Sequence, residues 1–350
     1  TLFPYTTLFR SHPGRLKRQA LCAWHAIAKS SGGDTWFPFA TIREGLRSNI
    51  SSTTVDVERA MQLAVRGGLL SETFHGGQRW VAERKKADDE QRIAELIDEA
   101  RVEALADNVA RPQWSGIADE LGDDVTDHQR EAARLAMAGY VGVLSGRPGT
   151  GKTWTTARIV ARLKEHFGES SIAIAAPTGK AAVRVTAAIE AVGLKLRATT
   201  IHSLLGYTGG EGFRYNSSHP LPETFVIIDE ASMIGTDMMR ALLDARAEGS
   251  HVLFVGDPHQ LAPVSHGSPL RDFTMSAGSV PHGTLTEIQR NSGRIVKACG
   301  EIIDRRRLTP SAKLDVAAGE NLLLIERDTA VFMDNSAPFP LDALEIDYVK

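Results

Sequence analysis

Residues 141–153 read VGVLSGRPGTGKT, and this stretch decides the fold. A short apolar run, suited to a buried strand, leads into a segment with the pattern G-x-x-x-x-G-K-[ST], whose glycines let backbone N–H groups wrap phosphate oxygens. A helix predicted over 153–164 directs the positive end of its dipole at the same point. We therefore expect a loop that binds the phosphates of ATP, formed by Gly146, Pro148, Gly149, Thr150, Gly151, Lys152 and Thr153.

Two side chains of this loop carry the predicted chemistry. The Lys152 ammonium is expected to reach the β- and γ-phosphate oxygens and so to serve catalysis as well as binding. The Thr153 hydroxyl is expected to be a ligand of Mg²⁺. A merely structural glycine loop is disfavoured because the pattern stands between a predicted strand and a predicted helix.

Further apolar runs at 172–176, 225–228 and 252–255 alternate with helical stretches. Short runs that are apolar throughout are suited to burial on both faces, which is typical of a parallel sheet with crossover helices. The expected fold class is therefore α/β.

Polar residues follow two of these runs directly. Asp229 and Glu230 end the run at 225–228, and two adjacent carboxylates repel one another unless a cation is present. We expect Asp229 to hold Mg²⁺ and Glu230 to act as the general base for an attacking water. Gln260 follows the next run, and its amide, which donates and accepts at once, suits sensing of the γ-phosphate. A simple tight turn at Asp257 is the alternative for that segment.

A second expected anion site follows the run at 172–176. Two anion sites in one domain suggest one for a nucleotide and one for a phosphate backbone. For His202 a packed structural role is an equal alternative. The residues expected to contact DNA are Pro177, Thr178, Gly179, Lys180, Thr200 and His202.

Taken together and in order, these segments resemble a known family. The phosphate loop, APTGKAA, TIHSLLGY, VIIDEASM and GDPHQLAPV are similar to the RecD-like branch of the superfamily 1 DNA helicases, the exodeoxyribonuclease V alpha-subunit type. The resemblance covers roughly 124–305. It implies a RecA-like P-loop NTPase sheet and ATP-driven translocation on single-stranded DNA, typically 5′ to 3′. It further implies that Gln129 reads adenine and that Arg290 reaches the γ-phosphate.

The resemblance and the residue patterns of the flanking segments together divide the rest of the chain. It implies a strand-separating hairpin insert at 206–222, where Phe213 and Tyr215 would stack on bases or simply pack. The family's later motifs are not found before Lys350, so we expect a truncated fragment. The expected segments are a winged-helix-like α+β domain at 12–83, a solvated helical linker at 84–123, a first motor domain at 124–284 and the start of a second at 285–350.

Composition sets wider limits. The 350 residues contain 40 Lys and Arg against 43 Asp and Glu, for a net charge of −3, so the protein as a whole is not a basic nucleic-acid coat. Two cysteines fit a reducing cytoplasm, and no apolar run is long enough for a membrane span. Residues 1–11, TLFPYTTLFRS, resemble the translation of a short-read sequencing adapter and are expected to be an artefact.

Three functions therefore stay open at the level of sequence. The first is an ATP-dependent helicase or translocase in recombination, repair or phage replication, acting on single-stranded DNA and its junctions with duplex, with recombination or replication proteins as partners. The second is the helicase part of a conjugative relaxase, which residues 12–110 disfavour because they contain scattered histidines and no tyrosine. The third is a DNA-binding or assembly module whose ATPase is inert.

Overall fold

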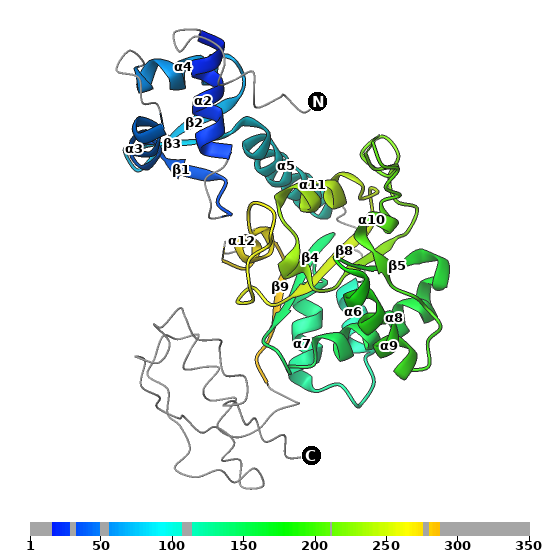
Figure 1. Cartoon of the computed structure of the whole chain (residues 1–350). Coiled ribbons are helices and arrows are strands. Elements are labelled where there is room, and N and C mark those ends of the chain that lie inside the picture. Colours follow the sequence, from blue (N-terminus) through cyan, green and yellow to red (C-terminus); the bar gives the residue numbers. More distant parts are fainter. Residues whose placement is uncertain are drawn as a thin grey trace, which may run out of the picture. The chain divides into compact units, whose positions relative to one another are not determined.

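The structure, a computed structural model, describes residues 16–28, 33–49, 56–106, 114–210, 212–275 and 280–287. All of them fall within the unit Thr1–Arg290 (Figure 1). The predictions for residues 1–11 and 288–350 lie outside the described residues.

The N-terminal part of the chain, from α2 to β3, combines helices with a small antiparallel sheet, as the winged-helix-like prediction requires. The strand order is β1-β3-β2, and apolar side chains of the helices, such as Ala23 and Met61, form one core with Val81 of β3. Gly76 and Gly77 join β2 to β3 with φ of 59° and 74°, the left-handed conformation that a two-residue hairpin turn needs. The elements are α2 (Leu16–Ala28), β1 (Trp36–Pro38), α3 (Phe39–Asn49), α4 (Val57–Arg66), β2 (Leu70–His75) and β3 (Gln78–Glu83).

The larger part is a parallel sheet of six strands in the order β6-β5-β7-β8-β4-β9. The four runs predicted from the sequence are its four inner strands, which confirms the α/β prediction. The two edge strands, β6 and β9, were not predicted. The bounds are β4 (Val141–Gly146), β5 (Ile172–Ala176), β6 (Thr199–Thr200), β7 (Phe225–Ile228), β8 (His251–Gly256) and β9 (His282–Leu285).

Helices cover both faces of this sheet, and neighbouring residues of one strand alternate between two cores. Val226 and Ile228 of β7 belong to one core, and Phe225 and Ile227 to the other. One face carries α5 (Arg84–Ala106), α10 (Ile201–Leu204), α11 (Thr236–Asp244) and α12 (Pro269–Met275), and the other carries α6 (Trp114–Asp119), α7 (Asp127–Ala136), α8 (Lys152–Phe167) and α9 (Gly179–Ala191). Two short 3₁₀ helices are η1 (Glu169–Ser171) and η2 (Ala231–Met233).

Helix α5 corrects one expectation, because it packs into the core on one face of the parallel sheet rather than forming a solvated linker. Its apolar side chains Ile93, Leu96, Ile97 and Ala100 are buried in the core that also contains α11, whereas Leu105 near its end is 65% exposed.

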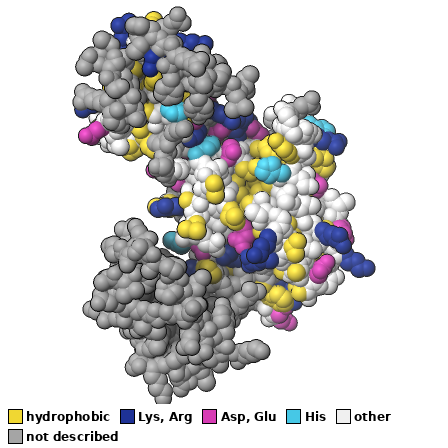
Figure 2. Space-filling model, viewed as in Figure 1, with side chains coloured by type: hydrophobic (Ala, Val, Ile, Leu, Met, Phe, Trp, Pro, Cys, Tyr) yellow, Lys and Arg dark blue, Asp and Glu magenta, His cyan; other side chains and the backbone are white. Residues whose placement is uncertain are grey.

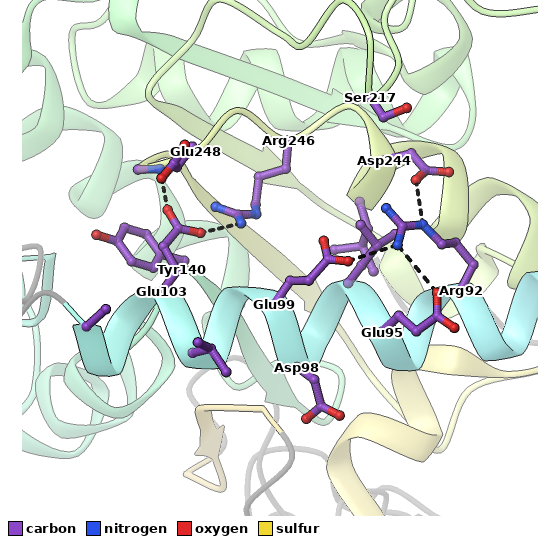
Figure 3. A pocket seen from close by; sticks show the side chains of 15 residues that line it. Arg92, Glu95, Asp98, Glu99, Glu103, Tyr140, Ser217, Asp244, Arg246 and Glu248 are labelled. Atoms are coloured by element: carbon purple, nitrogen blue, oxygen red, sulfur yellow. Dashed lines mark hydrogen bonds and ion pairs between the residues drawn. The ribbon is translucent and has the colours of Figure 1, made fainter.

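Ion pairs also join α5 to α11 and to the segment that follows α11. Arg92 Nε donates to Asp244 Oδ1 at 3.1 Å, and Arg246 Nη2 to Glu103 Oε2 at 2.5 Å. Figure 3 shows both pairs across a cavity of about 1130 Å³ beside the helix.

Helix α7 lies very close to the sheet. A Cβ atom at Gly142 of β4 would stand 1.7 Å from the Ala136 carbonyl oxygen, and one at Gly283 of β9 would stand 1.8 Å from that of Ala132. Only glycine at both positions lets the helix pack at this distance. The approach fixes α7, and with it Gln129 in its first turn, against two adjacent strands.

The described surface is mixed in charge. On the face shown in Figure 2, basic and acidic side chains are interspersed, in keeping with a net charge of −3. Within the described ranges, no helix combines the length and the apolar character needed to cross a lipid bilayer.

Candidate active site

The predicted motifs gather at the carboxyl ends of the parallel strands. The phosphate loop follows β4, the Asp229–Glu230 pair follows β7, and the segment with Gln260 follows β8. The two expected DNA segments follow β5 and β6. Ligands of open α/β sheets bind at this edge, where crossover connections leave a crevice.

The phosphate loop has the backbone that its glycines predict. Gly149 and Gly151 have φ of 84° and 88°, and Gly151 is the N-cap residue of α8, which has no side-chain cap. Thr150 makes a hydrogen bond inside the loop, because its Oγ1 donates to the Arg147 carbonyl oxygen at 2.8 Å. The first N–H groups of a helix 16 residues long therefore stay available for an anion.

Lys152 stands over this loop. Its ammonium donates to the carbonyl oxygens of Gly146 at 2.5 Å and Arg147 at 3.2 Å. Burial lowers the pKa of Lys152 below its ordinary 10.5, and the carboxylates of Asp257, Glu230 and Asp229 oppose that shift. The Lys152 ammonium therefore lies near these three carboxylates. The phosphate chain of a bound nucleotide would lie between the ammonium and the carboxylates.

Asp229 is buried, with 4% of its surface exposed. Burial raises the pKa of Asp229 to about 6, although the backbone N–H of Glu230 donates to its Oδ1 at 2.9 Å and works in the opposite direction. Because burial disfavours the ionised carboxylate of Asp229, a cation bound beside it would stabilise the negative charge. Thr153 and Asp229 line one cavity and offer the oxygen atoms that Mg²⁺ prefers, so the residues fit the ion.

Glu230 has an unusual backbone. Its φ of 53° makes it the one non-glycine residue with positive φ among those described. Such a conformation costs about 1–3 kcal/mol and persists where the surroundings impose it. Its side chain lines the same cavity as Lys152 and Asp229.

Arg184 is a residue of this site that no sequence motif indicates. It lies on α9, and its Nη1 donates to Glu230 Oε1 at 3.2 Å. The signal was weak, because only its spacing of four residues from Lys180 places it on the helix face that carries the expected DNA contact.

One cavity of about 570 Å³ brings most of the predicted nucleotide residues together. Gln129, the expected adenine contact, is buried, and its Oε1 accepts from the Thr126 N–H at 3.1 Å in a capping box. Gln260 is exposed, while Asp257 beside it accepts the His259 N–H and so forms the tight turn of the alternative interpretation. The lining comprises Asp124, Thr126, Gln129, Pro148, Gly149, Gly151, Lys152, Thr153, Trp154, Arg184, Asp229, Glu230 and Gln260.

The expected DNA residues lie at the ends of two adjacent strands, β5 and β6. Thr178, Gly179 and Lys180 are exposed, and Pro177 is half-buried. Thr178 and Thr200 use their hydroxyls to cap α9 and α10.

Aromatic rings gather beside this second segment. The exposed His202 ring packs edge-on against Tyr207 with centroids 5.5 Å apart. In the predicted insert at 206–222, Phe213 and Tyr215 pack against the core, which is the second of their two predicted roles. Tyr207 is the more exposed ring at 55%. Arg290 lies outside the described residues.

Comparisons with known proteins found a matching family and similar chains. Residues 124–315 match the family described as AAA domain. RecBCD enzyme subunit RecD of Mycobacterium tuberculosis (strain H37Rv) is 36% identical over 230 residues, 61% of this chain and 39% of that protein. The ATP-dependent RecD2 DNA helicase of Deinococcus radiodurans is 32% identical over 293 residues, 81% of this chain and 39% of that protein. A crystal structure of Pif1 helicase from Candida albicans is similar with a TM-score of 0.38 and 21% identity, over 55% of this chain and 46% of that one. The chain thus spans 39% of the length of these two curated relatives.

Proposed function

We propose a function from one premise: the chain belongs to the AAA domain family, and its homologues include RecD and RecD2 proteins. It is the ATP-binding motor domain of a DNA helicase or translocase. The motor hydrolyses ATP and moves along single-stranded DNA, 5′ to 3′ as the sequence resemblance implies.

The residues of the cavity divide the chemistry among them. Lys152 and the first N–H groups of α8 bind the phosphates, and Thr153 with Asp229 would hold Mg²⁺. That ion, when bound, neutralises charge on the β- and γ-phosphates. Glu230 accepts a proton from the attacking water, and Gln260 responds to the γ-phosphate. Arg290, from beyond the described residues, would stabilise charge in the transition state.

The observation that carries the proposal is the link between two anion sites through α9. The helix begins at Gly179, within the segment 177–180, and its Arg184 holds the carboxylate of Glu230 at 3.2 Å. A phosphate backbone bound at the helix start therefore acts on the element that positions the general base. Single-stranded DNA is accordingly expected to accelerate hydrolysis.

The test is ATP binding and hydrolysis with and without oligo(dT). Wild-type protein is expected to bind Mg-ATP and to hydrolyse it faster with DNA. Lys152→Ala is expected to lose tight binding. Glu230→Gln is expected to keep binding and to lose hydrolysis about 100-fold or more, because only the base is removed. Glu190→Gln, on the exposed far end of α9, is the matched control and is expected to behave as wild type.

Two results would contradict the proposal. Hydrolysis unchanged by single-stranded DNA would leave a general ATPase without a DNA role. Normal hydrolysis by Glu230→Gln would show that another group acts as the base.

The biological setting is proposed on the relatives alone. One relative is named as a subunit of RecBCD and another as a DNA helicase, so we place this protein in DNA recombination or repair, with single-strand and duplex junctions as its substrate. Recombination or replication proteins are its expected partners.

A further inference from the structure

Trp154 is a large apolar side chain that lines the nucleotide cavity. It directly follows Thr153 in the first turn of α8, and 37% of its surface is exposed. Single exposed apolar residues are common on protein surfaces and need no explanation. This one stands inside a cavity whose remaining lining is mostly polar, beside the phosphate loop.

The indole is held in place by one neighbour, which a second residue fixes in turn. The guanidinium carbon of Arg158, one turn along α8, lies 4.4 Å from the centre of the Trp154 ring. Arg158 is itself fixed by an ion pair with Asp124, which lines the same cavity. The guanidinium occupies one face of the ring, so the exposed remainder is rigid before any ligand arrives, and rigid contact surface binds at a low entropic cost.

The residues that line the cavity fall into two chemical groups. Lys152, Glu230 and Gln260 carry the groups expected to meet phosphates and the attacking water. Asp124, Thr126 and Gln129 precede or begin α7 and form a different part of the lining. Arg158, which pairs with Asp124, lies against the indole, so Trp154 stands beside this second group. A base that extends from phosphates bound in the loop toward the second group would meet the indole.

We propose that Trp154 is a stacking platform for the base of the bound nucleoside triphosphate. This inference rests on the proposed function, because it assigns a part of the same nucleotide site. Every base has a π-face, so stacking contributes affinity without selecting among bases. Selection then belongs to groups such as Gln129 that meet the edge of the base.

The experiment separates the base from the phosphates by calorimetric titration with Mg-ATP, Mg-GTP and Mg-tripolyphosphate. Trp154→Ala is expected to weaken ATP and GTP about tenfold each and to leave tripolyphosphate unchanged. Trp154→Phe is expected to restore most of the loss. Phe167→Ala removes another partly exposed ring from the same helix, one that contacts Trp114 outside the cavity, and is expected to bind all three ligands as wild type.

The outcomes are distinct. Equal ATP affinity in wild type and Trp154→Ala would overturn the platform, as would a parallel loss of tripolyphosphate, which would show that the residue acts through the phosphate loop. If wild-type protein binds tripolyphosphate as tightly as it binds ATP and GTP, the platform is also overturned, while the phosphate site stands. Wild-type protein that binds none of the three would overturn the proposed function itself.

Discussion

One buried imidazole is predicted to make the stability of this protein fall in mild acid. His251 begins β8 and has 0% of its surface exposed. Its ring stacks on Phe225 with centroids 4.6 Å apart, and its Nδ1–H donates to the Gly139 carbonyl oxygen. Nε2 has no partner among the described residues. Burial lowers the pKa of His251 to about 3, because the charged ring would lose its hydration.

The sign and the size follow from linkage. An imidazole in the unfolded chain titrates near pH 6.5, so between about pH 3 and 6.5 the unfolded state binds a proton that the folded state refuses. The free energy of unfolding therefore rises with pH in this window and is lost as the pH falls. Between pH 7 and pH 5 the loss from this residue is about 2 kcal/mol.

The assay is urea unfolding at pH 7 and pH 5 for wild type and His251→Phe. The phenyl ring keeps the stack on Phe225 and cannot titrate, while the unpaired Gly139 carbonyl lowers stability at both pH values alike. Wild type is expected to lose about 2 kcal/mol more than the variant on acidification. His251→Gln supplies a second non-titrating variant if the phenyl ring does not fit. Equal losses in wild type and variants would refute the reasoning.

Two further predictions test the site and the packing that supports it. Arg184→Ala is expected to leave ATP affinity within about twofold and to lower the ratio of DNA-stimulated to basal hydrolysis, with Arg184→Lys intermediate because a lysine lacks the guanidinium fork. An unchanged ratio would show that α9 does not act through Glu230. Gly142→Ala is expected to destabilise by about 2 kcal/mol or more in thermal or urea unfolding, because its methyl group would meet the Ala136 carbonyl oxygen at 1.7 Å. Gly116→Ala, on a helix with nothing within 4 Å of the added atom, is the control and is expected to be neutral or slightly stabilising; equal stability of the two variants would contradict the close packing of α7.

Much of the sheet could be predicted because its inner strands carry their own signal. Each of the four inner strands is an apolar run bounded by polar residues, and burial on both faces requires just that composition. The edge strands lack it. β6 has two residues, and β9 reads HGTL, so its pairing with β4 rather than its composition defines it. The helical period of α5 is visible in the sequence, but its partner α11 lies far along the chain, so the local pattern indicates a linker.

The site was predictable to the extent that its residues belong to local motifs. Lys152, Asp229, Glu230 and Gln260 each follow a strand, and the sheet brings them to one cavity. Arg184 and Trp154 could not be found in the same way. Arg184 lies 46 residues before Glu230 and meets it only in the folded chain. The position of Trp154 depends on Arg158, which an ion pair with Asp124 fixes.

The backbone of Glu230 shows how the fold and the chemistry compete at one position. Glycine adopts a φ of 53° freely, and a glycine would relieve the strain at the end of β7, yet it would bring no carboxylate. The chain keeps a glutamate there, and Asp229 Oδ1 accepts its N–H while Arg184 holds its side chain. Both contacts fix the residue in the disfavoured conformation from opposite ends. A residue retained against its own backbone preference, between a cation and a buried acid, is where a general base is expected to be.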